Sequence, residues 1–324
     1  MVAEAQPLLQ APDEERPIFV VGAHRSGTTL LQALLGAHPR IGAPPEVDFY
    51  GRVWVRRDEF GDLSDDAALK AVVEFTLNRR TLQEAGFDVA SVYARACSGE
   101  RTYAGVLRAV MTDFAVQHGK VRWCEKTPLQ PVAWLWEQFP SAQLVHIVRD
   151  PRDSVASHRN MPFANPAPVE LARRWRDFTA RALRDGAAHD PSAYLRIRYE
   201  DLARDPASVL RQVFTFLDED FDPAVLQEPE RRRSTVPPVD HGWLGKVMGP
   251  ITPPEEGAWR QQLPRLAQLR IAPIVASFLP GLGYEPAARG DVVIGRVVNG
   301  VAAPLEAGHQ LVTRARRRLA RKSL

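Results

Sequence analysis

Cysteine, lysine and long apolar runs are all scarce in this chain. Cys97 and Cys124 are its only cysteines, too few for a disulfide framework or a thiolate zinc site, so we expect a cytoplasmic protein. The sequence has no stretch of about 18 uninterrupted apolar residues, which argues against a transmembrane segment. The first residues have no basic region followed by an apolar run, so we expect no secretory signal.

Positive charge is concentrated near the end of the sequence. The net charge is +3, but residues 291–324 hold seven Arg/Lys and two Asp/Glu, and the remainder carries a net charge of −2. A nucleic-acid-binding protein usually has its positive charge on the folded body, so we expect no nucleic-acid partner. Only five lysines accompany 37 arginines. Two of these lysines, Lys126 and Lys246, fall in segments that we assign below to ligand contact.

Strand and helix patterns alternate along the chain. Short apolar runs predict strands at 17–21, 121–124, 142–148 and 193–199, each followed by a helical pattern. This alternation predicts an α/β fold with a doubly wound parallel sheet flanked by helices. Residues 60–118 are expected to form a mostly helical insertion, 222–257 a proline-rich loop and 259–279 a helix.

These patterns predict three regions. Residues 1–16 form a flexible lead-in, 17–286 the main domain and 287–324 a basic tail. The tail has two interpretations: a solvated terminus, or a basic amphipathic helix that makes peripheral contact with a membrane or a partner. In the second interpretation, Leu311, Val312, Ala315 and Leu319 lie opposite Arg314, Arg317, Arg318 and Arg321.

The strongest local motif follows the first predicted strand and opens a helix. It runs Gly22-Ala23-His24-Arg25-Ser26-Gly27-Thr28-Thr29. In such a P-loop-type setting, backbone N–H groups and the helix N-terminus bind an anion. A nucleotide-hydrolase loop would have lysine where this chain has Thr28, and the cation comes earlier, as Arg25. The alternative is a glycine turn with an incidental arginine.

A second anion site is predicted after the third strand. Asp150 suits a helix N-cap and Pro151 the first helical position. Arg149 then ends the strand, Ser157 lies about two turns into the helix, and both can contact one phosphate. The alternative is a capped helix with a surface Arg–Asp pair. Two anion sites at strand ends together favour a nucleotide phosphorylated at both its 5′ and 3′ ends.

The motifs together resemble the sulfotransferases that use 3′-phosphoadenosine-5′-phosphosulfate (PAPS). Residues 25–30 resemble the family's 5′-phosphosulfate loop, and 149–157 its 3′-phosphate motif. Residues 123–128, 198–202 and 257–260 match further family segments, the last of them the element that closes over the nucleotide. The resemblance covers about 17–285, in the family's order.

Within that family the sequence is most similar to the tyrosylprotein and bacterial branch. The cytosolic aryl and steroid enzymes have lysine at the position of Arg25, and their catalytic histidine corresponds to Pro128, which cannot act as a base. The tyrosylprotein branch has an arginine in the loop and a glutamate base 21 residues later, which corresponds to Glu46.

The resemblance implies transfer of a sulfuryl group from PAPS to a hydroxyl, with 3′-phosphoadenosine-5′-phosphate (PAP) as product and no metal. Glu46 is the implied general base, and Arg25 and Lys126 stabilise the developing charge. The implied nucleotide-binding residues are Arg25, Ser26, Gly27, Thr28, Thr29, Arg149, Ser157, Tyr199 and Lys246.

Two other functions stay open: a P-loop small-molecule kinase, and a non-catalytic nucleotide-binding protein of the same fold. Glu125 is a second candidate base, whereas His24 and His146 are more typical of structural histidines. The acceptor is a carbohydrate, a lipid, a phenol or a natural product. The sequence does not predict the oligomeric state. Candidate acceptor-site residues are Trp54, Arg56, Arg57 and 162–166.

Overall fold

A computed structural model describes residues 16–159, 166–235, 245–253 and 255–302. It separates into two compact units, one formed by Met1–Arg149 and Asp177–Pro254, the other by Asp150–Arg176 and Glu255–Leu324. Within the described residues, no helix is both long and apolar enough to cross a bilayer.

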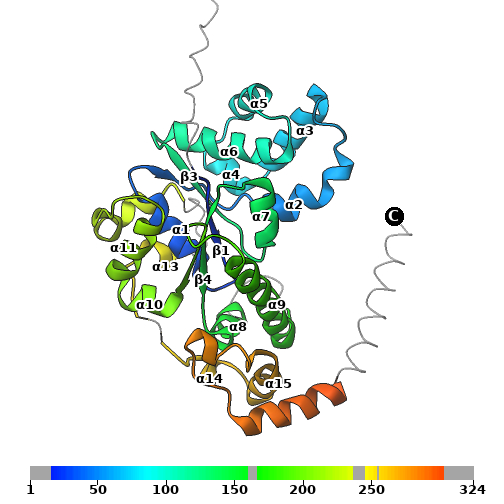
Figure 1. Ribbon diagram of the computed structural model, residues 1–324, viewed down its shortest axis with the longest axis vertical. Coiled ribbons are helices and arrows are strands. Elements are labelled where there is room, and N and C mark those ends of the chain that lie inside the picture. The colour runs from blue at the N-terminus through cyan, green and yellow to red at the C-terminus, as the bar shows by residue number, and fades with distance from the viewer. Residues whose placement is uncertain (1–15, 160–165, 236–244, 254, 303–324) are drawn as a thin grey trace, which may run out of the picture. The chain divides into compact units, whose positions relative to one another are not determined.

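A parallel sheet of five strands forms the centre of the first unit (Figure 1). The strand order is β2-β3-β1-β4-β5, and every neighbouring pair is parallel. The chain therefore fills one side of β1 before it crosses to the other, and ligands of α/β proteins bind at such reversals. The strands are β1 (Ile18–Val21), β2 (Ile41–Gly42), β3 (Arg122–Lys126), β4 (Gln143–Val148) and β5 (Tyr194–Arg198).

Helices connect and cover these strands. Asp65, Asp88 and Thr102 cap three of them, because each side chain accepts backbone N–H groups of the first turn. The elements of the first unit are α1 (Thr28–Gly36), α2 (Phe49–Arg52), η1 (Trp54–Glu59), α3 (Asp66–Leu77), α4 (Arg80–Glu84), α5 (Val89–Ser98), α6 (Tyr103–Gln117), α7 (Val132–Gln138), α10 (Tyr199–Arg204), α11 (Pro206–Phe216), α12 (Ala224–Gln227), η2 (Pro229–Arg232) and α13 (Gly245–Met248).

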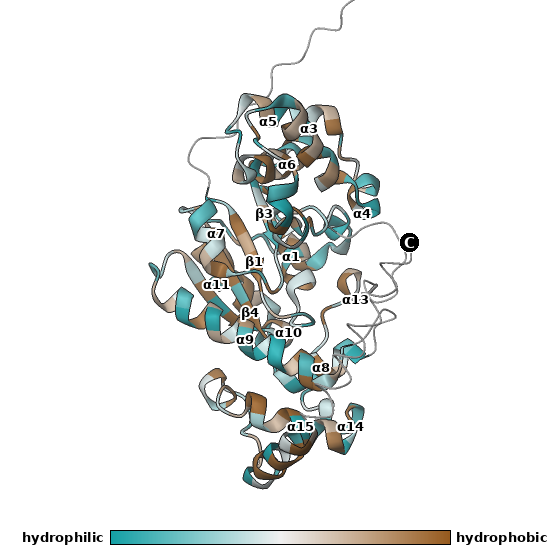
Figure 2. Cartoon of the chain, turned by 90° about the vertical axis from the view of Figure 1, so that its right-hand side faces the viewer, coloured by the Kyte–Doolittle hydropathy of each residue, from teal (hydrophilic) through white to brown (hydrophobic). Residues whose placement is uncertain are grey.

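Both faces of the sheet are buried, because side chains alternate along each strand and helices cover each face. On one face, Ile18 and Val20 belong to the same apolar cluster as residues of α1 and α11. On the other, the Phe19 ring lies edge-on to Trp123, with ring centroids 5.5 Å apart. Figure 2 shows β1 and β4 as largely apolar.

The second unit is mostly helical and is held together around the start of α8. Asp150 accepts the Arg152 N–H at 2.8 Å, and Asp153 accepts the N–H groups of Gly257 and Trp259 at 3.2 and 2.9 Å. These bonds tie α8 to the segment that precedes α14. The elements are α8 (Pro151–Arg159), α14 (Trp259–Gln262), α15 (Arg265–Val275), η3 (Pro280–Leu282), a helix at 289–302, and the first part of α9 (Pro168–Ala187), which ends in the first unit.

The predicted α/β class and four of the five strands are confirmed, as is the helix that opens at the phosphate loop. Two predictions are wrong. Residues 222–257 are not simply a loop: short helices form there because the buried Arg232 guanidinium donates to main-chain carbonyls such as Val247 O, at 3.0 Å. The helix expected over 259–279 is interrupted at Leu263, since the residue before Pro264 avoids the helical conformation.

Candidate active site

All five parallel strands end at one edge of the sheet, and a predicted site residue lies at or just after each end. The loop 22–27 follows β1, and Glu46 follows β2 by four residues. Lys126 is the last residue of β3. Arg149 follows β4 and Tyr199 follows β5. Sheet topology therefore gathers residues that are up to 174 positions apart in the sequence.

The phosphate loop depends on glycine at two positions. Gly27 has φ of 94°, and a Cβ there would come within 2.4 Å of Tyr199 Cδ2. A Cβ at Gly22 would lie 2.7 Å from the Ile147 carbonyl oxygen. Arg25 also adopts a left-handed conformation, with φ of 64°. Gly27 provides no side-chain cap to α1, so backbone N–H groups at the helix start are available to an anion.

Lys126 connects this loop to the predicted base. Its Nζ lies 2.6 Å from Glu46 Oε2 and 3.2 Å from Thr29 Oγ1. The lysine side chain is only 11% exposed and the Glu46 side chain 28%, so the ion pair is shielded from water yet the carboxylate stays accessible. One ammonium thus contacts both a hydroxyl of the first helical turn and the carboxylate after β2.

Arg25 and Arg149 lie close together beside Tyr199. Arg149 donates to the Arg25 carbonyl at 3.1 Å, and its guanidinium carbon lies 4.6 Å from the centre of the Tyr199 ring. Burial, followed by the charge of Arg149, lowers the pKa of Arg25. A bound anion would offset the repulsion between these two cations. The site therefore has the electrostatic character that a phosphate or sulfate ester requires.

The segment that carries Glu46 is fixed by two hydrogen bonds to its backbone. Arg79 donates to the Glu46 carbonyl at 2.6 Å, and Gln32 of α1 donates to the Pro44 carbonyl at 2.8 Å. Arg79 was not predicted from the sequence. It precedes α4 in the helical insertion, 33 residues from its partner, and no local motif marks it.

Glu125, the second candidate base, is fully buried on β3. Neither of its carboxyl oxygens has a hydrogen-bond partner among the described residues. Burial, followed by the nearby charges of Glu46 and Asp48, raises the pKa of Glu125 well above its usual range. Burial and Glu46 also raise the pKa of Asp48. A carboxyl that is buried away from the acceptor and has a raised pKa is less suited to act as an ionised base, so Glu46 is the better candidate.

For two predicted nucleotide-binding residues, a place in this group stays a prediction. Ser157 lies half-buried in α8 of the second unit, so its pairing with Arg149 stays a prediction. Lys246 falls in α13, but its side chain lies outside the described residues. No cluster of three or more His, Cys, Asp or Glu suited to a metal ion occurs in the part of the chain that the structure describes.

Of the two histidines near the motifs, His146 is not suited to catalysis. His146 is buried in β4, its Nδ1 lies 2.5 Å from the Tyr194 hydroxyl, and burial lowers its pKa to about 3. It is therefore neutral and part of the packing between β4 and β5. His24 is exposed in the phosphate loop. A structural role is thus supported for His146, and for His24 it stays a prediction.

A parallel sheet with an anion-binding loop, paired arginines and a lysine–carboxylate pair at its carboxyl edge defines the protein as an α/β enzyme of the group-transfer type. Comparison with known proteins identifies the group. A sequence model of the sulfotransferase family matches residues 17–223, more than half of the chain. The chain belongs to the sulfotransferase family, as its motifs predicted.

Curated relatives carry the same family name, and a solved structure shares the fold. Protein-tyrosine sulfotransferase 1 of Danio rerio is 24% identical over 83% of this chain and 72% of its own length. The protein-tyrosine sulfotransferase of Drosophila melanogaster is 27% identical over the same share of this chain, which spans about half, 52%, of that relative. The sulfotransferase domain of the Synechococcus PCC 7002 olefin synthase shares the fold, with a TM-score of 0.57 and 24% identity over 86% of this chain and 99% of that domain.

Proposed function

We propose that the protein transfers the sulfuryl group of PAPS to an acceptor hydroxyl, with Glu46 as the general base. The double contact of Lys126, to Thr29 of the phosphate loop and to the Glu46 carboxylate, carries this proposal. It joins the loop predicted to hold the donor to the carboxylate predicted to activate the acceptor. Membership of the sulfotransferase family supports the reaction class.

The residues at the sheet edge fit PAPS, which supplies the transferable sulfuryl group when it is bound. The buried Ser26 hydroxyl has no hydrogen-bond partner within the described part of the chain, as expected of a group reserved for a ligand. It lies in the loop with the main-chain N–H groups that would hold the 5′-phosphate. Residues that would hold the nucleotide are Arg25, Ser26, Gly27, Thr28, Thr29, Arg149, Ser157, Tyr199 and Lys246.

The chain's own groups divide the chemical work. Glu46 accepts the proton of the acceptor hydroxyl at its carboxylate, a role that contributes about 10²–10⁴-fold to the rate. Arg25 and Lys126 stabilise the negative charge that develops on the reacting oxygens, and they are held in place before the reaction begins. Arg79 and Gln32, through the backbone of residues 44–46, position the base.

The acceptor is proposed only as a hydroxyl compound. The names of the curated relatives add peptidyl tyrosine to the phenols, carbohydrates, lipids and natural products that the sequence leaves open. Trp54 of η1 lies against Trp134, with ring centroids 5.3 Å apart, and the Arg57 guanidinium lies over Trp54 at 4.9 Å. This aromatic group is our candidate for the acceptor side. A cytoplasmic location also stays a proposal, supported by two free cysteines.

Ligand-induced thermal stabilisation and sulfate transfer test the proposal together. PAP should raise the melting temperature, whereas ATP with Mg²⁺ should not, because only a ligand of the folded state stabilises it. Radiolabelled PAPS should then label a phenol, a tyrosine peptide or a component of a cell extract, and Glu46→Gln should bind PAP while it transfers far more slowly. Stabilisation by ATP and phosphate transfer would instead establish the kinase alternative, and PAP binding without any transfer the non-catalytic one.

A further inference from the structure

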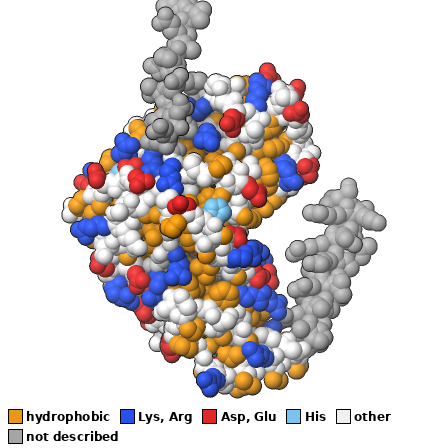
Figure 3. All heavy atoms as spheres, in the orientation of Figure 1, with side chains coloured by type: hydrophobic (Ala, Val, Ile, Leu, Met, Phe, Trp, Pro, Cys, Tyr) orange, Lys and Arg blue, Asp and Glu red, His pale blue; other side chains and the backbone are white. Residues whose placement is uncertain are grey.

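The helix at 289–302 of the second unit turns apolar residues outward. Val293, Ile294, Val297 and Val301 are 60%, 49%, 64% and 69% exposed. The three valines are spaced by four residues, so they form one stripe along the helix, and Ile294 lies beside it. Four of the seven large apolar side chains that are exposed in the described chain lie on this one helix. In Figure 3, apolar side chains line the lower edge of the molecule over this helix.

The opposite side of the same helix is fixed to α15 by polar groups and a glycine. Asp291 pairs with Arg265. Asn299 accepts from the Arg270 side chain at 3.0 Å and donates to the Arg270 carbonyl at 2.8 Å. Gly295 is buried, and a Cβ there would come within 2.0 Å of the Leu269 carbonyl oxygen.

The usual arrangement of a surface helix is therefore reversed at this place. A helix that packs on a protein normally buries its apolar stripe and exposes its polar one. Here Asp291, Gly295 and Asn299, also spaced by four residues, face α15, and the valine stripe faces away. Because the packing does not use the outer valines, their exposure calls for another partner.

The charge around the stripe indicates what that partner is. Arg289 lies four residues before Val293 and Arg296 three residues after it, so both border the stripe, and both are exposed. The 22 residues that follow the helix, 303–324, add six Arg/Lys and one Glu. Residues 289–324 thus carry a net charge of +6, whereas the rest of the chain carries −3.

We propose that the outer face of helix 289–302, formed by Val293, Ile294, Val297 and Val301 and bordered by arginines, binds the surface of an anionic lipid bilayer. Apolar side chains on one face with arginines beside them are the composition of helices that lie in the membrane interface. The basic residues attract acidic headgroups, and the slightly acidic remainder of the chain is repelled by them. The bilayer is therefore expected to contact this end of the sequence.

Flotation of the full chain with lipid vesicles tests the proposal. We expect binding to phosphatidylcholine vesicles that contain about one third phosphatidylglycerol, little binding to pure phosphatidylcholine, and weaker binding at high salt. Combined Val293→Ser, Val297→Ser and Val301→Ser substitutions should reduce binding about tenfold or more. The melting temperature and the sulfate transfer rate with a soluble acceptor should not change, since these side chains are exposed.

The control is a single valine-to-serine substitution on the inward side of the helix. Val298→Ser, at a half-buried position, should lower the melting temperature and leave vesicle affinity of the folded protein unchanged. Equal binding of the triple serine variant and the wild type would overturn the proposal and assign binding to residues 303–324. The absence of binding to anionic vesicles would also overturn it. So would a dimer, measured by light scattering, that the triple variant abolishes, because the stripe would then be a self-association surface.

Discussion

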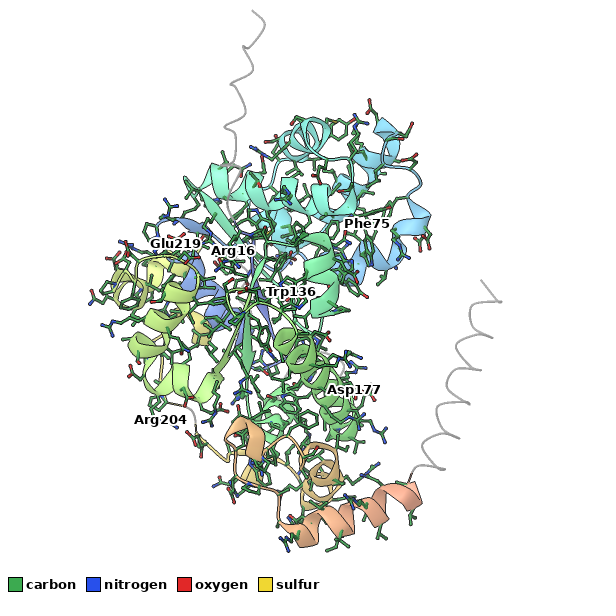
Figure 4. All side chains as sticks on the ribbon, viewed as in Figure 1. Arg16, Phe75, Trp136, Asp177, Arg204 and Glu219 are labelled. Carbon is green, nitrogen blue, oxygen red and sulfur yellow. The ribbon has the colours of Figure 1, made fainter. Side chains whose placement is uncertain are left out.

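The two ends of the central sheet use similar residues for opposite purposes. At the amino end, the Arg122 guanidinium donates from one nitrogen to the Leu217 carbonyl and Glu219, and from the other to the Arg16 carbonyl and Gln143, at 2.5 to 3.1 Å. Figure 4 labels Arg16 and Glu219, two of these neighbours. One carboxylate, one side-chain amide and two carbonyls accept from the two terminal nitrogens of this arginine, so most of the cost of its burial is offset.

At the carboxyl end, like charges lie close together and buried polar groups have no partner within the described residues. Arg25 lies beside Arg149, and the hydroxyls of Ser26 and Thr127 and both Glu125 oxygens are buried without hydrogen bonds. Such groups cost stability. The amino end therefore stabilises the fold, whereas the carboxyl end gives up stability to keep groups available to a ligand.

The largest effect is expected from Glu46→Gln at the carboxyl end. The amide cannot accept the acceptor proton, so the transfer rate should fall by about 10²–10⁴-fold, while PAP affinity and the melting temperature stay near those of the wild type. Initial rates with radiolabelled PAPS measure this. The matched control is Glu219→Gln, which should lower stability and keep the rate per folded molecule. A fully active Glu46→Gln enzyme would remove Glu46 from the mechanism.

Arg122→Met should have the next largest effect, on stability alone. Loss of the guanidinium leaves buried carbonyls and the Glu219 carboxylate without a partner, which should lower the free energy of unfolding by about 3–5 kcal/mol. Urea unfolding measures the loss. If the variant instead transfers sulfate more slowly at unchanged stability, the proposal that the amino end of the sheet serves stability and the carboxyl end serves ligand binding is wrong.

Gly27→Ala should lower stability by about 1–3 kcal/mol and weaken PAP binding. The new Cβ meets both an unfavourable φ and the Tyr199 ring. Gly61→Ala is the control, because Gly61 also has positive φ, 83°, but no atom within 4 Å of the added Cβ. Calorimetric titration with PAP should show weaker affinity for the first variant only. Equal affinities would show that Tyr199 does not need this close contact.

The last prediction concerns Glu125→Gln, whose effect on the free energy of unfolding should depend on pH. Folding raises the pKa of Glu125, so the folded chain holds this proton longer than the unfolded chain does. The resulting stabilisation is complete below the ordinary pKa of about 4.3 and is lost as pH rises through the raised value. The free energy of unfolding of the wild type, measured relative to that of the variant, should therefore fall by up to about 1.4 kcal/mol per pH unit above pH 5. Urea unfolding at several pH values measures the difference, and a difference that stays constant with pH would mean that Glu125 is ionised.

The sequence predicted much of the fold because the strong signals were local. Apolar runs located four strands, and Gly22, Gly27 and Asp150 marked the turns that follow them. It missed β2, which has only two residues, Ile41–Gly42, too short for a periodic pattern. It also missed the short helices near Arg232, since these depend on contacts with residues up to 17 positions away.

By itself, the sequence determined the phosphate loop, the family and the position of Glu46, because each rests on residue types at fixed short spacing. Only the tertiary structure decided that Lys126 contacts both Glu46 and Thr29, that Glu125 is buried, and that helix 289–302 turns its valines outward. These contacts and exposures depend on how segments distant in the sequence pack together. The same residues at the same spacing could lie buried or exposed, and paired or unpaired, until the fold fixes their neighbours.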